Sequence, residues 1–314
     1  MKDKVVVTGG AGFIGSHLVR ALVPNYSVVV IDDFSSGKAQ NLRSVRERAR
    51  MRIVRGDVRD RFLVKSLTRK AEAIFHLAAR PSVPRSIKNP VLTNSVNVDG
   101  TLNVLKCAVD NHVSKFVYSS SSSVYGESLT RLKKEELPPR PISPYAVSKL
   151  AGENYATAFY HTYGLPTVSL RYFNVYGPKQ APGPYAAVIT SFVNRLLAGK
   201  PPIIFGDGKQ ARDFTFVSDV VQANLLAMNR ERAIGEVLNV GTGRATSIND
   251  LAELAMQLCA KQKVGIIRGK SRVGDIKRSC ADISKAKRVL GYSPQVQLRA
   301  GLRTVVAWLR ETGR

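Results

Sequence analysis

The sequence predicts an α/β protein with a Rossmann-type doubly wound parallel sheet and a smaller, mostly helical C-terminal substrate lobe. Two observations favour this class. Short β-type runs alternate with helical patterns through the first half of the 314 residues, which is typical of repeated βαβ units and a parallel sheet. The first of these runs leads into a glycine-rich turn at the start of a helix, the place where such folds bind dinucleotides.

The elements of the first half follow from periodicity and from cap residues. Asp60 is placed to cap a helix over 60–70, and Gly164 to end a helix that starts after a cluster of prolines. A polar turn at Asn111 separates a long helical pattern from the next β-type run. We expect strands over 5–10, 27–32, 51–57, 73–79, 115–120 and 167–172, and helices over 13–22, 60–70, 89–111 and 145–164.

Past Asn174 the pattern is less regular, and loops rich in Gly, Pro and Arg separate the elements. We expect a second lobe here that exchanges a segment with the first. The expected helices cover 184–199, 219–229, 248–260 and 298–311, and an expected strand covers 237–241. The predicted division is a Rossmann domain over 1–171, joined by 213–240, and a substrate-binding lobe over 172–212 and 241–314.

The composition excludes several classes of protein. No apolar stretch is long enough to cross a bilayer, and the N-terminus passes directly into a strand without a signal-peptide pattern. We therefore expect a soluble, cytoplasmic protein without a membrane partner. The cysteines, Cys107, Cys259 and Cys280, lie far apart without metal-type spacing, which predicts free buried thiols and no metal site.

The net charge is strongly positive. Lys and Arg number 48 against 23 Asp and Glu, which gives +25 and an isoelectric point of about 10.3. Such a field attracts anions, nucleic acid among them. The basic residues are nevertheless spread along the chain without an arginine-rich tail or an aromatic-interleaved stripe. We interpret them as a solvated surface and expect no nucleic-acid partner, with a polyanion-binding face as the alternative.

The segment TGGAGFIGSH contains three glycines in dinucleotide spacing, Gly9, Gly12 and Gly15, between the first strand and the first helix. Glycine permits the tight turn and lets backbone N–H groups approach a pyrophosphate. Asp32 and Asp33 end the second strand, where a carboxylate binds ribose hydroxyls and repels a 2′-phosphate, so NAD is favoured over NADP. Asp57, at the end of the third strand, is either an acceptor for the adenine edge or a turn residue.

A tyrosine and a lysine, Tyr145 and Lys149, lie four residues apart at the start of the helix after the prolines. This spacing places both side chains on one helical face. A neighbouring ammonium and the positive nicotinamide ring are expected to lower the tyrosine pKa, which makes the phenol a usable base. The serine run SSSSS at 119–123 follows a β-type run, so its hydroxyls are expected at a strand end and not in a linker.

Together these features resemble the extended short-chain dehydrogenase/reductase family, and within it the sugar-nucleotide 4-epimerases that act on UDP-glucose or UDP-N-acetylglucosamine. The resemblance covers nearly the whole chain. It rests on the segments TGGAGFIGSH, HLAARPSVPRSI, SSSVYG, SPYAVSK, LRYFNVYGP, GDGKQARDFTFVSD and RVGDIKRS. It implies an isomerase with NAD as cofactor, a UDP-sugar as substrate and a homodimer formed through helices of the first lobe.

The resemblance also implies the site residues. The catalytic set is Ser121, which binds the sugar O4, Tyr145 and Lys149. The implied cofactor site is Gly9, Gly12, Phe13, Ile14, Gly15, Asp32, Asp33, Ser36, Gly37, Asp57, Val58, Leu77, Ala78, Ala79, Asn97, Tyr145, Lys149 and Tyr172. The implied substrate site is Ser82, Ser121, Ser122, Asn174, Ala187, Val188, Arg212, Arg272, Asp275 and Ser279.

The same resemblance narrows the reaction. The related 4,6-dehydratases carry an acid pair at the positions held here by Ser122 and Ser123, and the related decarboxylases carry a Glu at the second, so both reactions lack their acid. The small Ser279 leaves room for a 2-acetamido group, as in relatives that use UDP-N-acetylhexosamines. We expect reversible 4-epimerisation of a UDP-hexose through a 4-keto intermediate. The alternatives are a UDP-glucuronate 4-epimerase, a nucleotide-sugar reductase, and an NAD-sensing or polyanion-binding protein without catalysis.

Overall fold

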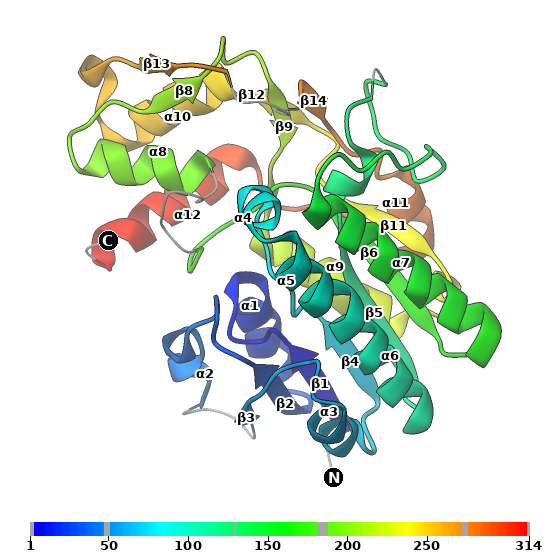
Figure 1. Ribbon diagram of the computed structural model, residues 1–314. Coiled ribbons are helices and arrows are strands. Elements are labelled where there is room, and N and C mark those ends of the chain that lie inside the picture. Colours follow the sequence, from blue (N-terminus) through cyan, green and yellow to red (C-terminus); the bar gives the residue numbers. More distant parts are fainter. Residues whose placement is uncertain (1–2, 47–50, 129, 181–187, 272–275, 313–314) are drawn as a thin grey trace.

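The computed structural model describes residues 3–46, 51–128, 130–180, 188–271 and 276–312. Its centre is a seven-stranded sheet in the order β3-β2-β1-β4-β5-β6-β11, and every neighbouring pair is parallel (Figure 1). The strands are β1 Lys4–Thr8, β2 Ser27–Asp32, β3 Met51–Arg55, β4 Ala73–His76, β5 Lys115–Ser121, β6 Thr167–Tyr172 and β11 Val237–Val240. The order reverses beside β1, as in doubly wound folds, so the predicted fold class is confirmed.

Helices cover both faces of this sheet. On one face lie α1 (Phe13–Leu22) and α9 (Val217–Asn229); on the other lie α3 (Arg61–Thr68), α6 (Gly100–Asp110) and α7 (Pro144–Tyr163). The strands therefore need apolar side chains on both sides. In β1, Val5 and Val7 belong to the core under α1 and α9, while Val6 belongs to the core under α3 and α6.

Several local signals act as predicted. The Asp60 carboxylate accepts from the Leu63 N–H at 3.0 Å and caps α3. Gly164 ends α7 in the left-handed conformation with φ of 67°. The expected helix over 89–111 is divided differently, into α5 (Pro90–Asn94), a π-helical turn over 95–99 and α6. Such π turns widen the helix locally and recur at functional sites.

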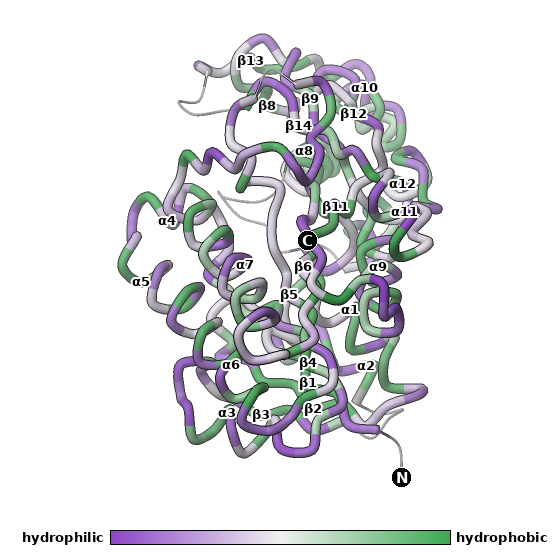
Figure 2. The backbone as a smooth tube through the Cα atoms, turned by 90° about the vertical axis from the view of Figure 1, so that its right-hand side faces the viewer, coloured by the Kyte–Doolittle hydropathy of each residue, from purple (hydrophilic) through white to green (hydrophobic). Residues whose placement is uncertain are grey.

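The second lobe packs three helices around a separate core. These are α8 (Val188–Leu197), α10 (Ile248–Cys259) and α12 (Leu298–Glu311), which lie at the top of Figures 1 and 2. Small sheets, which sequence patterns did not predict, border them. They comprise β7 Val175–Tyr176, β8 Ile203–Phe205, β9 Ala211–Asp213, β10 Thr215–Phe216, β12 Ala245–Ser247, β13 Ile267–Gly269 and β14 Arg278–Ser279.

The remaining helices are short. They are α2 (Arg43–Arg46), α4 (Val83–Lys88) and α11 (Ser284–Leu290), with single 3₁₀ turns at 39–42, 122–125, 231–233 and 262–264. The sequence assigned all of 241–314 to the second lobe, but α11 packs against β11 and α9 of the first. The reason is that Ala286, Leu290 and Tyr292 are buried in the core of the large sheet. The exact lobe boundaries stay a prediction.

Across the described ranges, no helix combines the length and the apolarity that a bilayer crossing requires.

A buried ion pair connects α7 to the sheet. Glu153 on α7 and Arg171 on β6 lie 2.6 Å apart, with only 3% and 5% of their side chains exposed. The Ser120 hydroxyl of β5 donates to the same carboxylate at 2.6 Å, and the guanidinium lies over the Tyr125 ring. A charge taken out of water needs partners of this kind, so the removal of one member leaves the other uncompensated.

We therefore expect Glu153→Ala to lower the free energy of unfolding by about 3–5 kcal/mol, because Arg171 then stays buried without its partner. Urea denaturation measures this loss. Glu253→Ala, at an exposed glutamate of α10, is the matched control and is expected to change the free energy by less than about 0.5 kcal/mol. A loss below about 1 kcal/mol in Glu153→Ala would contradict the structural role of the pair.

Candidate active site

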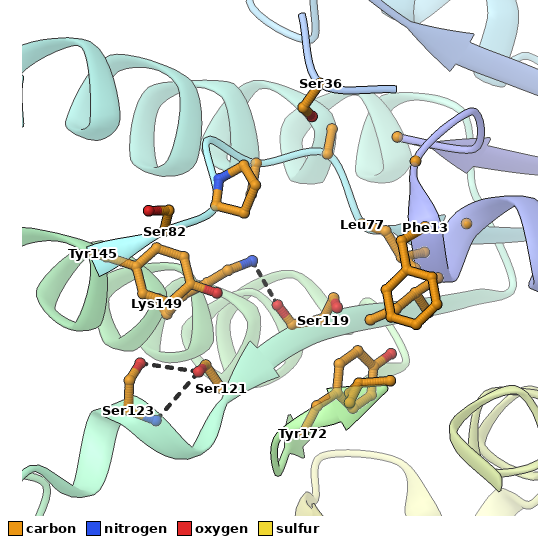
Figure 3. A pocket seen from close by; sticks show the side chains of 18 of the residues that line it. Phe13, Ser36, Leu77, Ser82, Ser119, Ser121, Ser123, Tyr145, Lys149 and Tyr172 are labelled. Carbon is orange, nitrogen blue, oxygen red and sulfur yellow. Dashed lines mark hydrogen bonds between the residues drawn. The ribbon is translucent and has the colours of Figure 1, made fainter. Parts of the chain in front are cut away.

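The candidate site is a cleft of about 690 Å³ at the carboxyl ends of the parallel strands. It opens where the strand order reverses between β1 and β4, and it extends between the two lobes. Figure 3 shows side chains from α1, β5, α7 and β6 converging on it. Clefts at this edge of an open α/β sheet are the usual ligand sites of the fold.

The glycine turn shapes one wall of the cleft. Gly9 has φ of +69°, and a Cβ there would lie 2.7 Å from the backbone nitrogen of Ala78. A Cβ on Gly15 would lie 2.2 Å from the Gly9 carbonyl oxygen. Side chains are therefore excluded at both positions. The turn brings backbone close to the cleft at the N-terminus of α1, which suits a pyrophosphate.

The acid at the end of β2 is held by the turn itself. The Asp32 carboxylate accepts from the N–H groups of Ala11 at 2.9 Å and of Phe34 at 2.8 Å. Burial raises the pKa of Asp32, and these two hydrogen bonds oppose the rise. Its neighbour Asp33 lies 3.6 Å from the guanidinium of Arg80. Two carboxylates thus line the position where an adenosine ribose is expected.

Asp57 is built into a turn as well as lining the cleft. Its carboxylate accepts from the backbone and the guanidinium of Arg59, and its carbonyl accepts from Asp60. The hydrogen bond from the Arg59 side chain, followed by that from its backbone, holds the pKa of Asp57 below its usual value. The sequence left two interpretations of Asp57 open, an acceptor for the adenine edge and a turn residue. These contacts favour the turn residue.

Most residues of the predicted cofactor site line the cleft, with two exceptions. Gly37 is not part of the lining but lies behind Asp32, where a Cβ would come 2.9 Å from the carboxylate. Asn97 is buried in the π-helical turn, where its side chain accepts from the Arg80 N–H at 2.6 Å. The lining set is Gly9, Gly12, Phe13, Ile14, Gly15, Asp32, Asp33, Ser36, Asp57, Val58, Leu77, Ala78, Ala79, Tyr145, Lys149 and Tyr172.

The three predicted catalytic side chains all line the cleft. Tyr145 and Lys149 come from the first two turns of α7 and Ser121 from the end of β5 (Figure 3). The Lys149 ammonium donates to the Ser119 carbonyl at 2.7 Å. Burial lowers its pKa to about 8. The ammonium also lies over the Tyr118 ring, 5.1 Å from its centroid.

The tyrosine pKa is subject to an effect that the sequence did not show, namely burial. Burial raises the pKa of Tyr145, and the hydrogen bond with Ser121 is the effect that lowers it. A nearby lysine was expected to lower this pKa, but Lys149 is committed to the Ser119 carbonyl. A phenolate at neutral pH therefore requires a further positive charge beside Tyr145, such as an oxidised nicotinamide ring.

The substrate side of the cleft is lined by Ser82, Ser122, Asn174, Val188, Arg212 and Ser279. Within the described residues, the side-chain nitrogen of Asn174 is buried and has no hydrogen-bond partner. A buried donor without a partner is costly unless a ligand accepts from it. The predicted residues Ala187, Arg272 and Asp275 lie outside the described residues.

A second pocket of about 200 Å³ adjoins the cleft and shares Asn174, Val175, Val188 and Arg212 with it. The sequence analysis missed this pocket. Its other lining residues are Tyr176, Ile189, Ile203, Phe205, Gln210, Phe214 and Ile248. An aromatic and aliphatic pocket next to an arginine suits a flat base joined to a phosphate. The apolar run IIF at 203–205, directly before the GDGKQARDF segment, was the sequence signal that could have indicated this pocket.

Further cleft residues were also missed, among them Pro81, Val83, Pro84, Val175 and Ile276. Some lie inside the SVPRSI segment, in which the sequence analysis had assigned a role to Ser82 alone. In the described part of the chain, no three His, Cys, Asp or Glu side chains are gathered so as to hold a metal ion.

Comparison with known proteins places the chain among nucleotide-sugar enzymes. A UDP-glucose 4-epimerase of Mycolicibacterium smegmatis is 41% identical over 98% of both chains. The solved UDP-glucose 4-epimerase of Thermotoga maritima with UDP-glucose matches with a TM-score of 0.94 at 39% identity, over 99% of this chain and 100% of the other. A UDP-N-acetylglucosamine 4-epimerase of Methanobrevibacter ruminantium, in complex with UDP-N-acetylmuramic acid, matches with the same TM-score, identity and coverage.

The relatives do not share one reaction. They include a dTDP-glucose 4,6-dehydratase of an Actinoplanes strain at 35% identity and a UDP-N-acetylglucosaminuronate decarboxylase of Bacillus cytotoxicus at 32%. A solved UDP-glucuronic acid 4-epimerase of Bacillus cereus, with UDP-glucuronic acid and NAD, matches with a TM-score of 0.92 at 36% identity over 98% of this chain. The family model described as GDP-mannose 4,6-dehydratase matches residues 6–305. The chain therefore belongs to this family of extended short-chain dehydrogenases/reductases.

Proposed function

We propose that the protein is an NAD-dependent isomerase that interconverts the C4 epimers of a UDP-hexose. The natural pair would be UDP-glucose and UDP-galactose, or their N-acetylated counterparts. The observation that carries this proposal is the convergence of Ser121, Tyr145 and Lys149 on a cleft that has a dinucleotide turn at one end and Arg212 at the other. The wild-type cycle needs no added reductant.

The residues of the first lobe fit NAD. The backbone around Gly9 and Gly15 approaches the cleft too closely for side chains, as a bound pyrophosphate requires. Asp32 and Asp33 present carboxylates for ribose hydroxyls and disfavour a 2′-phosphate. Bound there, NAD would supply the reversible hydride acceptor that epimerisation at the sugar C4 requires.

Each catalytic side chain has a separate task. Tyr145, as phenolate, takes the proton of the sugar 4-OH and gives it back after the sugar has turned. The Lys149 ammonium, fixed by the Ser119 carbonyl, adds positive charge to the cleft wall and would hold the nicotinamide ribose. Ser121 binds the sugar O4. Arg212 and Asn174 hold the diphosphate, and the second pocket receives the uracil base.

The chemistry of the lining supports epimerisation over two rival reactions. Elimination or decarboxylation needs an acid beside the sugar, and Ser122 and Ser123 occupy those positions. A uronate carboxylate needs a paired cation when it is buried. Among the described lining residues, only Lys149 and Arg212 are cationic, and both have tasks already, which favours a neutral hexose over glucuronate.

N-acetylated sugars fit the same site. Ser279 is small and buried on β14, and Ile276, Val188 and Val83, which line the same cleft, are apolar. An acetamido methyl group would find aliphatic contacts there, while an unsubstituted 2-OH would leave that space to water. We therefore include UDP-N-acetylhexosamines among the proposed substrates.

A homodimer is part of the proposal. The helices α5 and α7 pack against each other in front of the sheet (Figure 1) and expose apolar side chains outward. Val91 is 78% exposed, Tyr155 is 37% exposed, and Val147 and Ala158 are exposed beside them. Two such helix pairs can form a four-helix contact between copies of the chain.

We place the enzyme in the cytoplasm, in keeping with its composition.

The central test is product analysis by NMR with UDP-glucose, UDP-N-acetylglucosamine and UDP-glucuronate in separate reactions without reductant. We expect the 4-epimer of a neutral hexose. Tyr145→Phe should lower turnover by at least about 100-fold, since the proton acceptor is lost. Its bound NAD, measured after release from the protein, should remain. A requirement for stoichiometric reductant, or conversion of the glucuronate alone, would contradict the proposal.

The lowered pKa of Lys149 predicts that the free energy of unfolding depends on pH. Below about pH 8 the lysine is charged in both the folded and the unfolded protein, and its burial cost is present in full. Between about 8 and 10.5 the unfolded chain binds more protons, so the wild-type free energy of unfolding rises with pH. Lys149→Met has no titrating group at this position, so its free energy of unfolding lacks this rise.

We expect the stability of Lys149→Met relative to wild type to fall by roughly 3 kcal/mol in total as pH rises from 7 to above 10, measured by urea unfolding of cofactor-free protein. Lys200→Met, at an exposed lysine, is the control and should show no such trend. A difference between Lys149→Met and wild type that is independent of pH would show that the buried lysine titrates normally.

The dimer predicts a mass change on substitution. Val91→Glu combined with Tyr155→Glu should convert a dimer into a monomer of 34.3 kDa in light scattering, because two charges would be buried in the contact. Phe62→Glu, at a 90% exposed residue of α3 outside the proposed contact, should remain dimeric. A wild-type monomer, or a double variant that remains dimeric, would refute this interface.

A further inference from the structure

Ser123 has a hydroxyl to which the proposed mechanism gives no task. It lies in the turn after β5, and its Oγ donates to the Oγ of Ser121 at 2.9 Å. Its backbone N–H donates to the same oxygen at 3.2 Å. Both hydrogen bonds are drawn in Figure 3, below the Tyr145 ring. Ser121 therefore receives two donors from one neighbouring residue.

Two donors determine what Ser121 can still do. A serine hydroxyl has two acceptor lone pairs and one proton. Ser123 occupies both lone pairs, so the proton of Ser121 is the group left for a further hydrogen bond. Ser121 and Tyr145 line the same cleft, and the hydrogen bond with Ser121 lowers the Tyr145 pKa. Because both lone pairs of Ser121 are occupied by Ser123, Ser121 can only be the donor in that hydrogen bond.

We propose that Ser123 is a positioning residue that makes Ser121 a donor toward the Tyr145 oxygen and the sugar O4 beside it. The catalytic consequence rests on the proposed function, whereas the hydrogen-bond order rests on the geometry. A donor-only Ser121 stabilises the phenolate and the carbonyl oxygen of the 4-keto sugar. It cannot accept the 4-OH proton, which must therefore pass directly to Tyr145.

Two other serines of the run have partners away from Ser121. The Ser120 hydroxyl donates to Glu153 at 2.6 Å, behind the cleft. The Ser119 carbonyl accepts from Lys149. Ser123 is thus the residue of the run whose side chain and backbone both act on the catalytic hydroxyl.

The test follows the ionisation of Tyr145 by phenolate absorbance in NAD-loaded protein without any UDP-sugar. Wild type and Ser123→Ala are each compared with their own Tyr145→Phe counterpart, which isolates one of the 11 tyrosines. We expect Ser123→Ala to raise the Tyr145 pKa by about half a unit, since Ser121 loses one donor and can turn away. Ser123→Thr keeps the hydroxyl and should titrate like wild type. An unchanged pKa in Ser123→Ala overturns the proposal.

A Ser121→Ala background separates the relay from a direct effect. There, Ser123→Ala should add no shift of the Tyr145 pKa, because the interaction passes through Ser121; an equal shift in both backgrounds overturns the proposal.

Kinetics give a second readout, with the UDP-hexose that is turned over. On the acidic limb of the pH profile, kcat of Ser123→Ala should fall about threefold, the equivalent of half a pH unit, with KM within about twofold. A lower melting temperature with an unmoved Tyr145 titration would mark Ser123 as structural only and overturn the proposal. Because the titration uses no sugar, a failure of the epimerase function would show separately.

Discussion

The hydrogen bond from the Lys149 ammonium to the Ser119 carbonyl is the interaction on which the site depends. It requires α7 to lie directly on β5, and Gly152 permits this, since a Cβ there would come 2.3 Å from the Tyr118 hydroxyl. That hydroxyl donates to the Lys149 carbonyl and fixes the helix from the other side. A buried ammonium is costly, so this close packing is what holds the charge next to Tyr145.

The serine run shows how one strand end can serve several tasks. Ser120 joins the ion pair of Glu153 and Arg171, which ties β5 to α7 and β6. The Ser123 hydroxyl donates to Ser121 in the cleft. The support of the sheet by α7 and a directed hydroxyl in the cleft therefore come from neighbouring residues. Loosening one would move the other, which is why sites built on strand ends are more precise than sites on free loops.

Much of the first lobe could be predicted because its signals are local. The glycine turn, the Asp60 cap and the Tyr145 and Lys149 spacing act within a few residues, and parallel strands bring their ends together. The second lobe could not be predicted to the same degree. Its short strands depend on pairing with distant segments, and its pocket at Phe205 gathers side chains from five stretches of chain. The effect of burial on the tyrosine pKa could not be predicted, because burial and the direction of the Lys149 hydrogen bond are tertiary properties.

Asp213, a buried carboxylate next to Arg212, contributes to the contact between the two lobes. Asp213 accepts from the N–H and hydroxyl of Thr242, and from the N–H groups of Gly243 and Ala281. These donors follow β11 of the large sheet and β14, which carries Ser279. Separation of the lobes would leave a buried charge without its four donors, at high cost. For the proposed epimerisation, this favours a mechanism in which the keto-sugar would turn inside a cleft of fixed walls, with the nucleotide held in place and no opening of the lobes.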